Sequence, residues 1–275
     1  MTTPRSIRAI LFDLGGTLMY SRQPWEPILQ QGYEALAQSL CENGLNVDCT
    51  NLPGTVRYHL DRYFARRERD LVETTYFVVL RDLLAEQGHL DVAPLIIRRA
   101  LDAFYHHTQA NWYLEQDALL MLRTLEAGDY RLGIVSNAGD NQDVLQLVER
   151  FEILPFFDFV LTSADCSFRK PHPRIFELAL AHWNLSPREV AMVGDSLEAD
   201  VHGAQQLGMT GIWITRRASK PRPSDGANVD GAAPDPTPAL SEVEEPRATR
   251  HSSVRPDATL RSLRALPMLL SRITS

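Results

Sequence analysis

Five short apolar segments, each ending in a polar residue, limit the folds open to this chain of 275 residues. They are rich in Ile, Val, Leu and Phe and cover residues 7–13, 131–136, 157–162, 190–195 and 210–215. Runs of this length and composition are typical of strands buried on both faces of a parallel sheet. Helical patterns over residues 117–127, 141–151, 173–183 and 199–207 separate the last four. This alternation predicts a doubly wound, Rossmann-like α/β sheet that binds ligands beyond the carboxyl ends of its strands.

A long helical stretch interrupts the alternation after the first strand. Residues 20–113 show helical periodicity and few strand signals, with candidate helices over 27–43, 55–73, 76–87 and 92–111. A connection this long has to form a domain of its own, and four helices are enough for a small bundle. We therefore expect an α/β core of residues 1–19 and 114–217, with an inserted helical domain of residues 20–113.

The last part of the chain changes composition. No aromatic residue follows Trp213, and the segment 218–256 is rich in proline, which predicts a disordered insertion. An amphipathic leucine pattern then returns, so we expect residues 257–275 to form a terminal helix that packs on the core. A targeting tail is the alternative for this last segment.

Charge and cysteine content limit the partners and the location. A net charge of −7 and a pI near 5.6 argue against general nucleic-acid or anionic-membrane binding. No apolar segment reaches the length of a membrane span, and we expect a cytoplasmic protein. Cys41, Cys49 and Cys166 are odd in number and scattered, a pattern that favours reduced thiols. The sequence does not indicate an oligomeric state.

Polar residues at the predicted strand ends form an ordered series. Each has an ordinary structural explanation, such as a cap or a turn. Taken together and in this order, they make the chain resemble the haloacid dehalogenase-like (HAD) hydrolase superfamily, and specifically its phosphatase members with a helical cap inserted after the first motif. The residues that carry the resemblance are Asp13, Gly15 and Thr17, then Ser136 and Asn137, then Lys170, and last Asp195 and Asp200.

The resemblance implies a phosphatase that acts on a small phosphorylated metabolite. Asp13 would attack phosphorus and form an aspartyl phosphate, which water then hydrolyses. A Mg²⁺ ion would offset the repulsion between that carboxylate and the phosphate. The ion would be held by Asp13, the Gly15 carbonyl and Asp195, and by Asp200 either directly or through a group that itself binds the ion. The remaining phosphate contacts would come from Thr17, Ser136, the Asn137 amide and Lys170.

Lys170 stands out in the composition. Of the 28 Lys and Arg residues, only Lys170 and Lys220 are lysines. A compact ammonium fits between a carboxylate and a phosphate better than a planar guanidinium does. The choice of lysine at position 170 therefore favours a catalytic role.

Gly15 departs from the family pattern, in which an aspartate usually occupies this position. That aspartate protonates the leaving oxygen and then activates the water, and general acid–base help of this kind contributes about 10² to 10⁴ in rate. Glycine keeps the carbonyl for the metal but removes the acid. The substrate would then need a good leaving group, or the proton would come from a cap residue, water or the substrate. On this account Gly15→Asp should raise the turnover of alkyl phosphates.

Three other functions are weighed against the phosphatase. The main alternative is a weakened enzyme that binds a phosphorylated ligand and serves in regulation. Metal-independent haloacid dehalogenases place an aromatic residue at the position of Gly15, and the pair Asp195 and Asp200 argues against their chemistry. Phosphonate-cleaving relatives use a cap lysine, and the predicted cap contains none.

Trp25 could line the substrate cavity, although a place in the core is at least as good an explanation.

Overall fold

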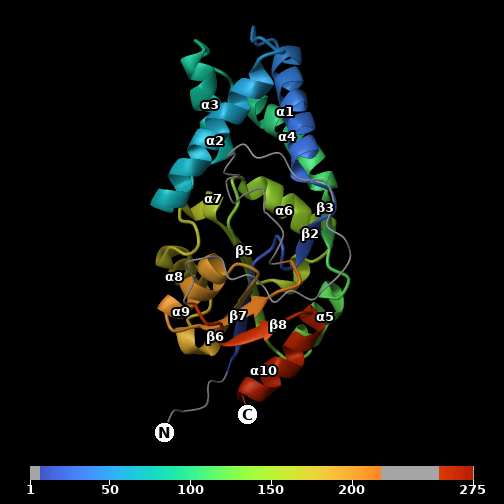
Figure 1. Ribbon diagram of the computed structural model, residues 1–275, viewed down its shortest axis with the longest axis vertical. Coiled ribbons are helices and arrows are strands. Elements are labelled where there is room, and N and C mark those ends of the chain that lie inside the picture. The colour runs from blue at the N-terminus through green and yellow to red at the C-terminus, as the bar shows by residue number, and fades with distance from the viewer. Residues whose placement is uncertain (1–6, 218–253, 275) are drawn as a thin grey trace, which may run out of the picture.

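A computed structural model describes residues 7–217 and 254–274. A parallel sheet of six strands, with helices around it, forms one part of the molecule (Figure 1). The strand order is β5-β4-β1-β6-β7-β8. Five strands confirm the predicted segments: β1 (Ala9–Phe12), β4 (Arg131–Ser136), β5 (Phe159–Thr162), β6 (Val190–Gly194) and β7 (Thr210–Ile214). The sixth, β8 (Ala258–Leu260), pairs in parallel with β7 and was not predicted.

Alternate residues of the central strand point into two separate cores. Ile10 and Phe12 pack with α5 (Ala118–Glu126), α6 (Asn141–Arg150) and α10 (Leu266–Thr274). Ala9 and Leu11 pack on the other face with α8 (Pro173–Ala181) and α9 (Gly203–Gln206). All four residues are buried, so the sheet is covered on both faces, as the doubly wound prediction requires.

Four helices lie together at one end of the molecule, away from the sheet (Figure 1). They have a hydrophobic core of their own, in which Tyr33 stacks on Phe104 with ring centroids 5.2 Å apart. The inserted helical unit of the predicted fold class is therefore present. Its helices are α1 (Trp25–Glu42), α2 (Leu52–Asp70), α3 (Tyr76–Glu86) and α4 (Pro94–Ala110).

Two short strands connect this helical unit to the sheet. β2 (Met19–Ser21) and β3 (Trp112–Leu114) pair in an antiparallel ladder that joins Ser21 to Trp112. Both strands have only three residues, and each lies across one border of residues 20–113, the stretch predicted to be helical. Their pairing brings Trp112 back to the loop that follows β1, since Gly15 itself bridges to Met19.

The carboxylate of Asp117 fastens the end of the chain to the core. It accepts hydrogen bonds from the Arg216 guanidinium at 2.5 and 2.7 Å, from the Ser262 hydroxyl at 2.6 Å and from the Arg264 amide at 3.2 Å. The segment that follows, α10, packs against α5 in the same core. The terminal helix predicted over residues 257–275 is shorter than expected, because residues 258–260 form β8 and the helix begins at Leu266. Most of the predicted disordered insertion, residues 218–253, lies outside the described residues.

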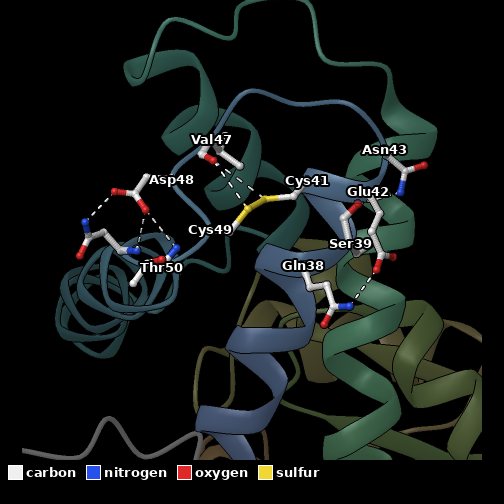
Figure 2. The surroundings of a disulfide bond; sticks show 10 residues. Gln38, Ser39, Cys41, Glu42, Asn43, Val47, Asp48, Cys49 and Thr50 are labelled. Carbon is white, nitrogen blue, oxygen red and sulfur yellow. Dashed lines mark hydrogen bonds between the residues drawn. A yellow bond between two sulfur atoms is a disulfide. The ribbon is translucent and has the colours of Figure 1, made fainter.

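The expectation of three reduced thiols is wrong for one pair. Cys41, at the end of α1, forms a disulfide with Cys49 in the loop before α2, with Cα atoms 6.6 Å apart (Figure 2). Scattered positions in the sequence gave no sign of this pairing, which depends on the turn between the two helices. Cys166 is a free thiol. Among the described helices, none is long and apolar enough to cross a membrane.

Candidate active site

Asp13 lies directly after β1, the strand between β4 and β6. This is the carboxyl edge of a parallel sheet, where doubly wound folds bind their ligands. The side chain is buried, and both carboxylate oxygens accept hydrogen bonds. Thr17 donates its hydroxyl to Oδ2 at 3.1 Å, and Lys170 donates Nζ to Oδ1 at 2.9 Å. Three residues from two predicted motifs therefore meet here.

Lys170 is buried and surrounded by oxygen atoms. Its Nζ lies 2.9 Å from Asp13 Oδ1 and 2.6 Å from Asp200 Oδ1, and it donates to the Val135 carbonyl at 2.7 Å. Burial alone would lower the pKa of this ammonium, but the charges of Asp13 and Asp200 outweigh it and raise the pKa above its ordinary value. Lys170 therefore stays positive beside the nucleophile candidate.

Three carboxylates meet at this edge. Asp13, Asp195 and Asp200 are all buried, and one oxygen from each lies within 4.8 Å of the others. Asp195 follows β6, and Asp200 lies in a short π-helical segment, Leu197–His202, an irregularity frequent at functional sites. A side chain on Gly194 would collide with the carboxylate of Asp200, so glycine is required there.

The charge balance of this group fits a divalent cation. Three buried carboxylates lie close together, two of them against the Lys170 ammonium, and neighbouring buried charges of one sign are stable only when they are compensated. Carboxylate oxygens are the ligands that hard divalent ions prefer. The donors present therefore suit an ion such as Mg²⁺, with Asp13, Asp195 and Asp200 as the side chains that would hold it and the Gly15 carbonyl close by in the same loop.

Ser136 and Asn137 lie at the end of β4 and line the same cavity as Asp13. The Asn137 side chain makes two hydrogen bonds to the backbone of Lys170: its Oδ1 accepts from the amide at 2.8 Å, and its Nδ2 donates to the carbonyl at 3.0 Å. The sequence predicted a phosphate contact through the Asn137 amide. The structure shows in addition that the side chain fixes the loop that carries Lys170.

Gly15 lies against Trp112. A Cβ atom built on Gly15 would be only 2.9 Å from Cη2 of the Trp112 ring. Trp112 in turn packs on Trp25, with ring centroids 5.1 Å apart and planes inclined by 57°. The indole therefore occupies space that the side chain of an aspartate at position 15 would need. Sequence reasoning did not identify Trp112, because only the pairing of β2 with β3 brings it to Gly15.

A cavity of about 180 Å³ opens from Asp13, Ser136 and Lys170 toward the helical unit. Trp25 lines this cavity. The sequence alone did not decide between a place in the cavity and a place in the core for this residue. Further residues that the sequence did not single out also line it, and several of them are aromatic: Tyr33, Phe64, Tyr76, Phe104, Tyr105 and Trp112.

Two ion pairs, one buried and one half-buried, hold the helical unit onto the core around this cavity. Glu73, in the loop before α3, is paired with Arg169, the residue beside Lys170, and accepts from the Ser163 hydroxyl at 2.6 Å. Arg98 of α4 lies 2.6 Å from Asp140 at the start of α6. With so many arginines in the sequence, no pattern distinguishes the buried ones from the exposed ones.

The chain matches two family models. That of the haloacid dehalogenase-like hydrolases matches residues 10–214, which include every motif residue discussed above. A second, HAD-hydrolase-like model matches residues 167–266.

Curated relatives and solved structures are similar over most of the chain. The glyceraldehyde 3-phosphate phosphatase of Pyrococcus abyssi is 37% identical over 210 residues, which are 76% of this chain and 81% of the relative. A HAD phosphatase from Thermococcus onnurineus superposes with a TM-score of 0.58 at 24% identity, covering 96% of this chain and 98% of that one. A 2-haloacid dehalogenase from Pseudomonas syringae gives 0.59 at 24% identity, covering 97% and 99%, so these structures agree on the fold. This chain belongs to the haloacid dehalogenase-like hydrolase family.

Proposed function

We propose that this chain is a Mg²⁺-dependent phosphatase that hydrolyses a small phosphate monoester through a covalent intermediate on Asp13. The observation that carries the proposal is the contact of Asp13 with Lys170 and Thr17 beside Asp195 and Asp200. The names of the relatives support it, since several are phosphatases, including a phosphoglycolate phosphatase from Salmonella paratyphi A, 25% identical over 78% of this chain.

In the first step, an oxygen of Asp13 forms a bond to phosphorus while the bond from phosphorus to the ester oxygen breaks. Thr17 and Lys170 hold the carboxylate in one orientation, which keeps its oxygens directed at the site. Ser136, the Asn137 amide and Lys170 bind the phosphate oxygens and stabilise the negative charge on them. A bound Mg²⁺ supplies further positive charge to the phosphate and to Asp13.

In the second step, water attacks the phosphorus of the aspartyl phosphate, and the bond to Asp13 breaks. The oxygen of the water stays on phosphorus, one of its protons passes to the solvent, inorganic phosphate leaves, and the carboxylate is regenerated. Gly15 provides no carboxyl group to protonate the ester oxygen or to deprotonate this water. We therefore expect the rate to depend strongly on how well the leaving group carries a negative charge.

The experiment is the hydrolysis of para-nitrophenyl phosphate and acetyl phosphate by the full chain, with and without Mg²⁺. We expect turnover that requires the metal and that falls to background in Asp13→Asn, a variant of nearly the same shape. Circular dichroism of the variant verifies that it is folded. Absence of turnover, together with Mg²⁺-dependent binding of a phosphate mimic, would instead identify a phosphate-binding protein, the alternative raised by Gly15.

A further inference from the structure

The wall of the cavity beside Gly15 is aromatic. Trp112 and Trp25 pack on each other, with ring centroids 5.1 Å apart, and both line the cavity together with Tyr33 and Phe104. The Trp112 ring lies against the backbone of Gly15, two residues after Asp13. A group that leaves the phosphorus on this side therefore meets the Trp112 ring rather than a carboxyl group.

The charged groups that line the cavity already have partners within the protein. Asp140 lies 2.6 Å from Arg98, and Arg169 is paired with Glu73. The carboxylate of Asp143 accepts a hydrogen bond from Gln109 at 2.9 Å. Asp140 and Arg169 are therefore compensated by charges of opposite sign, whereas Asp143 is bonded to a neutral amide and remains a polar group on the wall. Recognition of the part of the substrate that lies beyond the phosphate falls mainly to the aromatic rings.

The size of the cavity and the missing acid point to the same kind of leaving group. An apolar cavity of about 150 Å³ holds one benzene molecule. The cavity here measures about 180 Å³ and has to hold the phosphate as well, so it leaves room for a leaving group no larger than about one ring. A phenol has a pKa of about 10, as in the tyrosine side chain. A phenolate therefore leaves without a proton far more readily than the alkoxide of an ordinary alcohol.

We propose that the substrate is a phosphate monoester of a single-ring aryl alcohol, whose ring stacks on Trp112 while its phosphate lies at Asp13. This inference deepens the proposed phosphatase function and rests on it. In the reaction, the bond from Asp13 to phosphorus forms as the bond from phosphorus to the aryl oxygen breaks. The electron pair leaves with the phenolate, which water then protonates in solution.

The experiment compares kcat/KM for phenyl phosphate, glyceraldehyde 3-phosphate and acetyl phosphate. Glyceraldehyde 3-phosphate, the compound in the name of several relatives, is an alkyl ester, and acetyl phosphate has a good leaving group without a ring. We expect phenyl phosphate to exceed glyceraldehyde 3-phosphate by at least about a hundredfold, the usual contribution of general acid catalysis. Equal or better hydrolysis of the alkyl ester would overturn the proposal.

Variants of Trp112 test the stacking separately from the leaving group. Trp112→Leu should lower kcat/KM for phenyl phosphate about five- to tenfold, mainly through KM, and leave acetyl phosphate within about twofold. Trp112→Phe, which keeps a ring, should retain most of the activity on phenyl phosphate. Trp183→Phe is the matched control, because Trp183 is buried in the core on the other face of the sheet. An equal loss on both substrates in Trp112→Leu would contradict the stacking.

A failure of the proposed phosphatase function can be told apart from a failure of this inference. If none of the three phosphates is hydrolysed, the phosphatase function fails, and binding of phenylphosphonate and methylphosphonate decides the aromatic subsite. Tighter binding of phenylphosphonate that weakens in Trp112→Leu supports the subsite. Equal binding of the two phosphonates overturns it.

Discussion

The ring of Trp112 occupies the space into which a side chain at Gly15 would extend, with Cη2 only 2.9 Å from the position of a Cβ atom. Gly15 has no left-handed backbone conformation that would exclude another residue. The obstacle to an aspartate at this position is therefore Trp112, itself packed against Trp25. The absence of an acidic side chain at position 15 and the presence of the Trp112 ring therefore go together, because the ring occupies the space that such a side chain would need.

The gain from Gly15→Asp should depend on Trp112. The sequence alone predicts that Gly15→Asp raises the turnover of alkyl phosphates, but in the structure the new side chain has to displace the indole. We therefore expect little increase in the hydrolysis of glyceraldehyde 3-phosphate from this substitution alone. With Trp112→Ala, the new carboxyl group has room, and turnover of this alkyl ester should rise by about 10². Steady-state kinetics of wild type, both single variants and the double variant measure the effect. Equal rates for Gly15→Asp and the double variant would show that Trp112 does not obstruct the acid.

Mg²⁺ should stabilise the folded chain, because Asp13, Asp195 and Asp200 bring three buried carboxylates close together, and Asp13 and Asp200 share the Lys170 ammonium. At a hundred times its Kd, a ligand specific for the folded state contributes about 2.7 kcal/mol. We expect Tm to rise with Mg²⁺ in a thermal shift experiment, and the rise to be much smaller in Asp195→Asn. Asp165→Asn, at an exposed carboxylate, is the control. A full Mg²⁺ shift in Asp195→Asn would exclude Asp195 as a ligand.

The strands and motif residues could be predicted because each is defined by its local sequence. The apolar run before Asp13 marks both a buried strand and the place where it ends, and the same holds for Ser136 and Asp195. Parallel pairing brings such strand ends to one edge, so the meeting of Asp13 with Lys170 and Asp200 follows from topology.

Other parts of the structure depend on contacts that leave no local signal. Trp112 reaches Gly15 only through the pairing of two three-residue strands, too short for an alternating pattern to be visible. β8 has only three residues and no apolar run, and it is a strand because β7 offers it an edge. Cys41 and Cys49 meet because of the turn between two helices. Proximity of this kind arises from tertiary structure and cannot be read from periodicity.

Asp117 should contribute strongly to stability, since it joins α5 to Arg216, Ser262 and Arg264. We expect Asp117→Asn to lower the free energy of unfolding by about 1 to 3 kcal/mol, because it removes charge-assisted hydrogen bonds. Glu126→Gln, at an exposed position on the same helix, is the matched control. Urea denaturation measures both variants. If the free energy of unfolding falls equally little in Asp117→Asn and Glu126→Gln, the contacts of Asp117 do not hold the end of the chain to the core.

The lowered pKa of Asp117 predicts that the folded chain loses stability in acid. Burial raises the pKa of Asp117, but the hydrogen bonds from Arg216 and Ser262 prevail and hold the pKa well below its ordinary value. A group with a lowered folded-state pKa stabilises the protein above its unfolded-state pKa, and this contribution is lost as the pH falls. The difference in stability between wild type and Asp117→Asn should therefore shrink toward acid pH.

The pKa of Asp143 is shifted in the opposite direction from that of Asp117. It lies in the first turn of α6, lines the cavity and accepts a hydrogen bond from Gln109 of α4. Burial, and to a smaller degree the charge of Asp140, raise the pKa of Asp143 to about 7, although Gln109 and Arg98 act to lower it. The carboxyl group is therefore largely protonated below neutral pH in the folded chain and ionised in the unfolded one.

Stability should fall as the pH rises through the pKa of Asp143. A raised folded-state pKa means that the folded chain binds more protons, so this contribution is present in acid and is lost toward pH 8. A pKa that differs by one between the folded and unfolded chain corresponds to about 1.4 kcal/mol, and we expect a loss of about 2 to 4 kcal/mol from pH 5 to pH 8. Asp143→Asn, neutral at every pH, should remove most of this loss, whereas Glu149→Gln, exposed on the same helix, should not. Urea denaturation at pH 5 and pH 8 measures the free energy of unfolding of each variant. If that free energy changes with pH in the same way in wild type and Asp143→Asn, the pKa of Asp143 is not raised by folding.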